Sequence, residues 1–182
     1  NWKLIIIDDG SKDDTPLLIN KYLNDKRIIF KKLEENKGQG FCRNLALEYV
    51  SSNYIAFIDS DDIWDKDKLK KQIILMNNLN LDFTYSNYKS FSEIDGVKKF
   101  NKIINLPEKF TYSTFVKNTS ICTSTMIVRR EKIHQAKFLN ITSCDDYFFK
   151  CELLRNCNFA KKIGENLTLY RISKNSVQSN KL

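Results

Sequence analysis

Two clusters of aspartates stand at positions where carboxylates could hold a metal ion. Asp8 and Asp9 end the stretch "LIIIDD", and Asp59, Asp61 and Asp62 end "YIAFIDSDD" in a D-x-D arrangement. Gathering carboxylates is costly unless a cation or a ligand rich in hydrogen-bond donors offsets their charge. Magnesium and manganese prefer such oxygen ligands, and substrate phosphates and water complete their coordination. The acids therefore predict a divalent cation that bridges the protein to a diphosphate.

Several other kinds of site are disfavoured by the same sequence. A calcium EF-hand loop starting at Asp59 fails, because Trp64 stands where glycine is needed and Lys70 where the bidentate glutamate belongs. The single histidine, His134, excludes a multi-histidine metal site and argues against a histidine-based triad. The five cysteines form no C-x-x-C pair and their number is odd, which is typical of reduced thiols in a cytosolic protein.

The elements that must position these acids alternate between strands and helices. Apolar runs predict four strands, at residues 2–7, 27–33, 54–59 and 82–91. Helical patterns predict three helices, at residues 15–24, 41–50 and 66–79, the second with Phe41, Ala46 and Val50 toward the core. Later segments predict a hairpin around Asp95-Gly96, a strand at 124–130, a helix at 145–156 and a strand at 166–172. This order predicts an α/β fold with a mostly parallel sheet flanked by helices.

The predicted sheet explains why the acids follow strands. Ligands of open α/β sheets bind outside the carboxyl ends of the strands, so we expect both acid clusters along one rim. The loop "NKGQGFCRN" adds two glycines and Arg43 just inside a helix. Arg43 is expected to pair either with a phosphate or with one of the rim acids.

Composition limits the partners. The chain has 182 residues, which predicts one domain, and its net charge of +8 favours anionic partners such as nucleotides or an acidic membrane surface. The sequence shows no nucleic-acid-binding motif. Its apolar runs fall short of the roughly 18 residues that a membrane span needs.

The motifs resemble the family 2 inverting glycosyltransferases with the GT-A fold. "IIIDDGSKDDT", "NKGQGFCRNLAL" and "YIAFIDSDDIW" resemble the successive signatures of that family in order and spacing. "CTSTMIVRRE", "CDDYFFKCELL" and "LTLYRISKNSVQS" resemble its later segments. The resemblance implies a single GT-A domain over residues 1–182, with a nucleotide-sugar-binding half (1–85) and an acceptor-binding, catalytic half (86–182). The family's first strand is not matched, and we expect it upstream of this sequence.

The resemblance also assigns a donor site. Asp8 or Asp9 would accept a hydrogen bond from the base of a nucleotide sugar, which the resemblance makes a UDP-sugar, and Arg43 would lie beside the nucleotide. Asp59 and Asp61 would form the metal-binding pair, with Asp61 the main ligand. The remaining donor-site residues that the resemblance implies are Asp62 beside that pair and the late segment Tyr170–Arg171.

The resemblance places the catalytic pair at Asp145–Asp146. Inverting transfer needs a base that takes the proton of the acceptor hydroxyl, and that role falls to Asp146. Asp146 opens a predicted helix beside aromatic residues that would partly desolvate it. Asp145 stands where the family has glutamate, and Ser173 stands where many relatives have a histidine, a change that argues against a third protein ligand to the metal.

The implied function is transfer of a sugar, with inversion, to a glycan or lipid-linked acceptor during synthesis of a bacterial surface polysaccharide or lipooligosaccharide. The expected location is the cytoplasm or the inner face of the plasma membrane, and the oligomeric state stays open. Two alternatives remain. One is an inactive or truncated nucleotide-sugar-binding protein. The other is a haloacid-dehalogenase-type phosphatase with Asp59 as nucleophile, which would leave "DDGS" and "GFCRN" unexplained.

Overall fold

The computed structural model describes residues 1–134, 136–141 and 144–173, and these group into two compact units. Unit 1 comprises residues 1–51 and the described part of 136–149. Unit 2 comprises the described parts of 52–135 and 150–182. The predicted single domain with halves at 1–85 and 86–182 stays a prediction. Within the described ranges, no helix has the length and apolar character needed to cross a membrane.

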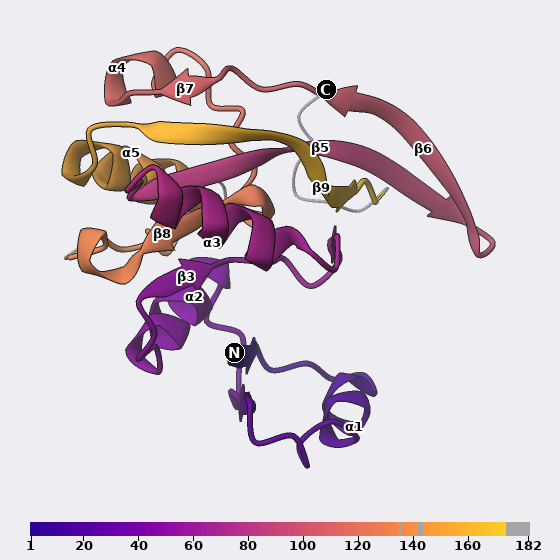
Figure 1. Ribbon diagram of the computed structural model, residues 1–182. Coiled ribbons are helices and arrows are strands. Elements are labelled where there is room, and N and C mark those ends of the chain that lie inside the picture. Colours follow the sequence, from indigo (N-terminus) through magenta and orange to yellow (C-terminus); the bar gives the residue numbers. More distant parts are fainter. Residues whose placement is uncertain (135, 142–143, 174–182) are drawn as a thin grey trace. The chain divides into compact units, whose positions relative to one another are not determined.

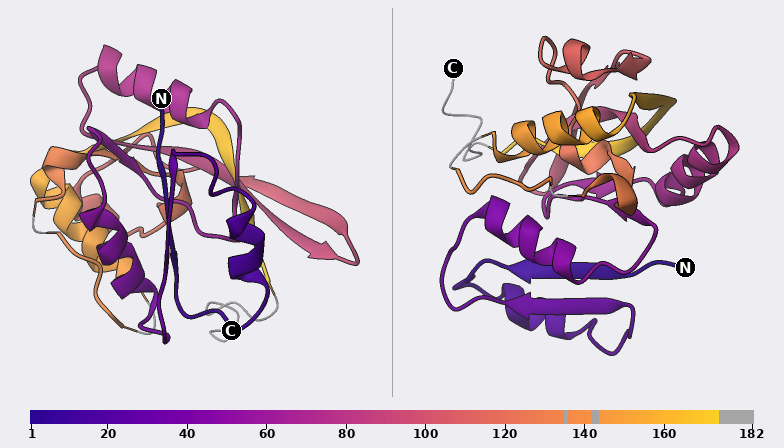
Figure 2. Two further views of the ribbon diagram at one scale, coloured as in Figure 1. Left: turned by 90° about the horizontal axis from the view of Figure 1, so that it is seen from below. Right: turned by 90° about the vertical axis from the view of Figure 1, so that its left-hand side faces the viewer.

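Unit 1 is built on a two-stranded parallel ladder. Strand β1 (Leu4–Asp8) pairs with β2 (Ile28–Lys32), so that Asp8 lies opposite Lys32. Helix α1 (Thr15–Asn20) connects them, with its N-cap at Asp14 and proline in its first turn. Helix α2 (Gln39–Glu48) packs against β1, as the right-hand view of Figure 2 shows. We expected Phe41 in the core, but its side chain is 39% exposed.

Unit 2 is built on a mixed sheet in the order β3-β8-β5-β9-β4, with β6 paired to β5 and β7 paired to β9. The strands are β3 (Tyr54–Ala56), β4 (Ile63–Trp64), β5 (Phe83–Ile94), β6 (Val97–Ile104), β7 (Lys109–Phe110), β8 (Ile127–Arg129) and β9 (Ala160–Arg171). The helices of the later chain are α3 (Lys68–Asn78), α4 (Tyr112–Phe115) and α5 (Asp145–Asn156), the last of which begins in unit 1. Two 3₁₀ turns, Thr123–Thr125 and Arg130–Lys132, flank β8.

The α/β class is confirmed, but the prediction of a mostly parallel sheet is wrong for the ladders that the structure describes. Among them, β1–β2 and β5–β9 are parallel and the other five pairings are antiparallel. Strand β3 is hydrogen-bonded to β8, which comes some 70 residues later in the chain. Apolar runs identify strands but do not specify such distant partners, and this is why the sequence predicted the elements better than their order.

Helix α3 covers one face of this sheet (Figure 1). Its Met76 is fully buried against Leu81 and Ile127, and partly buried side chains of α3 and β3 surround this cluster. Full burial of each such side chain stabilises the fold by roughly 1.5–3 kcal/mol. The apolar face of α3 therefore helps to hold together the sheet that includes β3, the strand that leads into the D-x-D segment.

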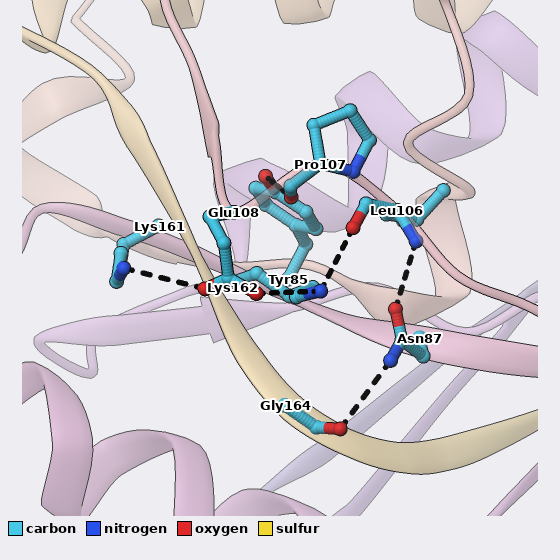
Figure 3. Close-up of polar contacts among 8 residues, drawn as sticks. All are labelled: Tyr85, Asn87, Leu106, Pro107, Glu108, Lys161, Lys162 and Gly164. Atoms are coloured by element: carbon cyan, nitrogen blue, oxygen red, sulfur yellow. Dashed lines mark hydrogen bonds and ion pairs between the residues drawn. The ribbon is translucent and has the colours of Figure 1, made fainter.

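The segment after β6 is held to the sheet by polar contacts (Figure 3). The Leu106 N–H donates to Asn87 Oδ1 (2.9 Å), and Lys162 Nζ donates to the Leu106 carbonyl (2.8 Å). Tyr85 Oη donates to the Pro107 carbonyl at 2.6 Å. These bonds fix the base of the β5–β6 hairpin on β5 and β9.

Candidate functional site

Asp9 closes a loop of unit 1. Its two carboxylate oxygens accept the backbone N–H groups of Lys37 (2.6 Å) and Gly38 (2.9 Å), the residues that lead into α2. Gly10 has a φ of +74°, and a Cβ there would lie 2.9 Å from the backbone of Glu35. The "DDG" stretch therefore places the end of β1 directly against the loop before α2, and both oxygens of Asp9 are used in doing so.

Asp8 differs from its neighbour. It is buried at the end of β1, and its Oδ1 accepts the Ser11 N–H at 3.0 Å. Its Oδ2 is buried and has no hydrogen-bond partner among the described residues. A buried carboxylate oxygen without a donor is costly, which makes Asp8 the member of the pair with an oxygen left for a ligand's N–H.

Helix α2 also positions the segment that leads into α5. Asn44 makes a two-way amide contact with Phe138: its Nδ2 donates to the Phe138 carbonyl (2.8 Å), and its Oδ1 accepts the Phe138 N–H (2.9 Å). A Cβ on Gly40 would clash with the Leu139 carbonyl, so the helix approaches this segment closely because residue 40 is glycine. Phe138 stacks on the Phe149 ring with a centroid distance of 3.9 Å.

Arg43 forms a buried ion pair with Asp145. Its Nη1 lies 2.6 Å from Asp145 Oδ2, with the two side chains 13% and 10% exposed, and its guanidinium lies 5.2 Å from the centre of the Phe138 ring. Of the two partners predicted for Arg43, the structure therefore shows an acid, although this acid belongs to the later Asp145–Asp146 pair. Asp146 follows it in the first turn of α5 and is half-buried.

The D-x-D segment of unit 2 is held by Arg171 at the end of β9. The Arg171 N–H donates to Asp62 Oδ1 (2.9 Å), and its Nε donates to the Asp61 carbonyl (2.9 Å). Its Nη1 lies 2.6 Å from Glu93 Oε2 on β5. These contacts bury the Asp62 side chain and leave that of Asp61 exposed, while Asp59 is half-buried.

Ser124 is a second support of this segment, and its role was not predicted from the sequence. Its Oγ accepts the Asp59 N–H at 3.0 Å, and its carbonyl accepts the Trp64 indole N–H at 2.7 Å. Ser124 also donates to Asp62, which partly offsets the effect of burial on the pKa of that carboxyl. A serine between two threonines in "CTSTM" gives no signal of this role, since the contact depends on how β8 and its 3₁₀ turn lie beside the D-x-D segment.

Burial and neighbouring carboxylates change the pKa of the Asp62 carboxyl. The pKa of the Asp62 carboxyl is raised to about 6, mainly by burial, with smaller contributions from the nearby charges of Asp59 and Asp61. Its Oδ2 is buried without a hydrogen-bond partner in the described part of the chain. A buried, partly unsatisfied carboxylate beside two others is the kind of donor set that a divalent cation would stabilise.

The residues present fit a cation that is shared with a substrate. No group of three or more His, Cys, Asp or Glu side chains among the described residues is arranged to hold a metal ion. Magnesium and manganese commonly take only one or two carboxylates from a protein, and substrate phosphates and water supply the rest. The exposed Asp61 and half-buried Asp59 match that pattern, whereas Asp62 Oδ1 is already bonded to the backbone of Arg171.

Tyr170 lies beside the same segment, on β9. Its ring contacts that of Tyr88 at a centroid distance of 5.9 Å in an edge-to-face arrangement. Burial raises the pKa of the Tyr170 hydroxyl above its ordinary value. Tyr170 is therefore a neutral, packed side chain, whereas Arg171 makes the direct contacts to the D-x-D segment.

Lys68, the first residue of α3, lies beside the Trp64 ring and allows a stability prediction. It is fully buried, and its Nζ lies 4.4 Å from the centre of the Trp64 ring. That Nζ has no hydrogen-bond partner among the residues that the structure describes, and burial lowers the pKa of the amine to about 7. The folded protein therefore releases a proton that the unfolded chain keeps up to its ordinary pKa of 10.5.

Lys68→Met is expected to raise the free energy of unfolding, and more so at pH 6 than at pH 10. The folded state bears the full cost of a buried ammonium below pH 7, and the cost fades as the pH approaches 10.5. In the parent, stability should rise over that range by up to about 1.4 kcal/mol per pH unit. Urea unfolding at several pH values would check this. An equal pH slope in parent and variant would contradict the assignment to Lys68.

Comparisons with known proteins place the chain in a family. The model of glycosyl transferase family 2 matches residues 1–138. TuaG of Bacillus subtilis, named provisionally as a teichuronic acid biosynthesis glycosyltransferase, is 38% identical over 182 residues, which cover all of this chain and 71% of that protein. WfgD of Escherichia coli, named as a UDP-Glc:alpha-D-GlcNAc-diphosphoundecaprenol beta-1,3-glucosyltransferase, is 36% identical over the whole chain and 70% of its own length.

Solved structures agree on the fold. The crystal structure of S. aureus TarS 1–349 in complex with UDP-GlcNAc matches 99% of this chain with a TM-score of 0.79 at 21% identity. The chain spans 52% of that TarS structure. The likeness confirms the predicted GT-A fold. Together with the family match and the two relatives, it leads to one conclusion: the chain belongs to glycosyl transferase family 2.

Proposed function

We propose that the chain transfers a sugar, with inversion, from a nucleoside-diphosphate donor to a lipid-linked or glycan acceptor in bacterial surface polysaccharide synthesis. Family membership and the names of TuaG and WfgD support the reaction class and the process. The UDP-sugar named for WfgD and bound to TarS supports a uridine donor. The single observation that carries the proposal is the D-x-D segment, with Asp61 exposed while Arg171 and Ser124 hold its backbone.

On the donor side, Asp8 accepts a hydrogen bond from the base and Asp61 binds the cation. The free Oδ2 of Asp8 suits a ring N–H such as that of uracil, while Asp9 keeps its loop closed. Asp61, with Asp59 beside it, would bind magnesium or manganese together with the diphosphate. When bound, that cation neutralises the charge that develops on the departing diphosphate. Asp62 and Arg171 act by fixing the backbone of the segment.

On the acceptor side, Asp146 is the base. It takes the proton of the attacking hydroxyl, a role that contributes roughly 10²–10⁴-fold in rate. Asp145 pairs with Arg43 and anchors the first turn of α5, so that the neighbouring carboxylate has a fixed direction. We place the reaction in the cytoplasm, at the inner face of the plasma membrane, where a lipid-linked acceptor would be presented.

The two alternatives differ in what supports them. Family 2 membership gives no support to a haloacid-dehalogenase-type phosphatase with Asp59 as nucleophile. A binding protein without transfer activity would share the donor site, and only a transfer assay separates it from the proposal. If the parent chain binds nucleotide but transfers no sugar, the interpretation as a binding protein is favoured.

Asp61→Ala is expected to remove the manganese-dependent part of the affinity for UDP, because it deletes the exposed ligand of the pair. Calorimetric titration of UDP with and without manganese would measure this, using concentrations up to the millimolar range. The fold should be unchanged, since the Asp61 carbonyl that accepts from Arg171 stays in place.

Asp14→Ala is the matched control, because Asp14 is an exposed aspartate whose side chain makes no cap hydrogen bond. It should bind UDP as the parent does. If Asp61→Ala keeps the full gain in affinity on adding manganese, Asp61 is not the metal ligand.

A further inference from the structure

The β5–β6 hairpin carries apolar side chains that the described residues of unit 2 leave exposed. Every residue of β6 is exposed, and Figures 1 and 2 show the hairpin extending past the end of β9. At its tip, Ile94 and Val97 lie opposite each other and are 57% and 70% exposed. Ile104 lies on the same face as Ile94 and Val97, whereas Phe100 and Ile103 are exposed on the opposite face, so that both faces of the hairpin carry apolar side chains. This many exposed apolar side chains on one strand mark a candidate interaction surface.

Lysines are interleaved with these apolar residues. Lys98, Lys99 and Lys102 lie on β6 itself, and Lys89 lies on β5. Two of them border aromatic rings: Lys89 Nζ is 4.9 Å from the centre of the Phe100 ring, and Lys98 Nζ is 5.7 Å from that of Phe91. Of the two acids in the hairpin, Glu93 is paired with Arg171 and Asp95 lies in the turn. The hairpin therefore presents a basic and apolar surface together.

This combination fits a lipid surface better than a second copy of the chain. Among the strands that the structure describes, β6 is hydrogen-bonded only to β5, and lysines along such an edge oppose pairing with another strand that carries the same charges. Apolar side chains that insert at the headgroup boundary, flanked by lysines that meet anionic headgroups, are what interfacial binding needs.

The hairpin is also rigidly tied to the D-x-D segment. Glu93 on β5 binds Arg171, which in turn donates to the Asp61 carbonyl and to Asp62. At the other strand, the bonds of Asn87 and Lys162 to Leu106 fix the residues that follow β6 (Figure 3). A surface bound by the hairpin would thus be held close to the D-x-D segment of the same unit.

We propose that the β5–β6 hairpin docks the protein on an anionic lipid bilayer, with Ile94, Val97 and Phe100 inserted at the headgroup level and Lys98, Lys99 and Lys102 on the headgroups. The inference deepens the proposed function, since it explains how a lipid-linked acceptor would reach the site. Docking itself requires no sugar transfer, so the two can fail separately.

Vesicle co-sedimentation of the 182-residue chain tests the proposal. We expect binding to vesicles that contain phosphatidylglycerol, weakened by salt, and little binding to pure phosphatidylcholine. Lys98→Glu with Lys99→Glu should reduce partitioning at least about tenfold, and Val97→Ser with Phe100→Ser should have a similar effect. Lys70→Glu with Ile74→Ser on α3 is the matched control, because Ile74 is 48% exposed and Lys70 is also exposed. This control should bind like the parent.

A reporter variant locates the contact directly. The emission of Phe100→Trp, with the parent signal subtracted, should shift to the blue and be quenched by brominated lipid, since tryptophan at this site would enter the interface. All variants should keep the parent's unfolding midpoint and UDP affinity. The proposal is overturned by absence of binding to anionic vesicles, or by hairpin variants that bind as the parent does. It is equally overturned if the hairpin substitutions convert a dimer into a monomer without altering lipid binding.

Discussion

Asp146→Asn is expected to lower the rate of sugar transfer by at least about 10²-fold while UDP affinity stays at the parent value. An amide cannot take the proton of the acceptor hydroxyl, and the loss of a general base costs about this factor. The substitution keeps the size of the side chain in the first turn of α5. Donor binding should persist because we assign it to Asp8 and to the D-x-D segment. Initial-rate assays together with calorimetry would separate the two effects.

Glu152→Gln provides the control for Asp146→Asn, since Glu152 is an exposed acid of the same helix that pairs with Arg155. It should transfer sugar at the parent rate. The base assignment fails if Asp146→Asn turns over as fast as the parent, or if both carboxamide variants lose activity to the same degree.

Arg43→Met is expected to cost about 3–5 kcal/mol of the free energy of unfolding. It leaves the Asp145 carboxylate buried without its cation, and breaking one side of a buried ion pair has that cost. The same change should also reduce transfer, because the first turn of α5 loses the contact that directs Asp146. Chemical denaturation measures the first effect, and transfer at temperatures well below unfolding measures the second.

A double variant tests whether the pair itself is responsible. Arg43→Met with Asp145→Asn removes both charges and should recover most of the lost stability. Arg155→Met breaks an exposed pair on the same helix and should cost no more than about 1 kcal/mol. If Arg43→Met is no more destabilising than Arg155→Met, the buried pair does not anchor α5.

Local patterns predicted much of the fold. Helix α5 begins and ends where "DDYFFKCELLRN" predicted it, and the hairpin turns at Asp95-Gly96 as expected. These features depend on residues near one another in the chain, such as helix periodicity and turn chemistry. Sheet order does not, which is why the pairing of β3 with β8 was missed. The expected burial of Phe41 was also wrong, because the buried face of a helix can be assigned only when the element it packs against is known.

In the candidate site, too, features set by nearby residues were predicted and those set by distant partners were not. The sequence identified the acids, but it could not say which oxygens the fold would use. Both oxygens of Asp9 are bonded to backbone and one of Asp8 is not, a distinction that depends on the loop at residues 37 and 38. Ser124, in the 3₁₀ turn before β8, and Glu93, which acts through Arg171, support the D-x-D segment from distant parts of the sequence and have no motif of their own. The expectation that the early and D-x-D acids share one rim joins residues of the two units and stays a prediction.

The most direct test of the account is a thermal-shift screen of UDP-, GDP- and CDP-sugars with and without manganese. Ligands that bind the native state raise its unfolding temperature by mass action. We predict that UDP-sugars stabilise the chain, that this stabilisation requires manganese, and that GDP- and CDP-sugars have a much smaller effect. Equal shifts with and without manganese, or no shift with any nucleotide sugar, would contradict a donor site built on Asp8 and the D-x-D segment.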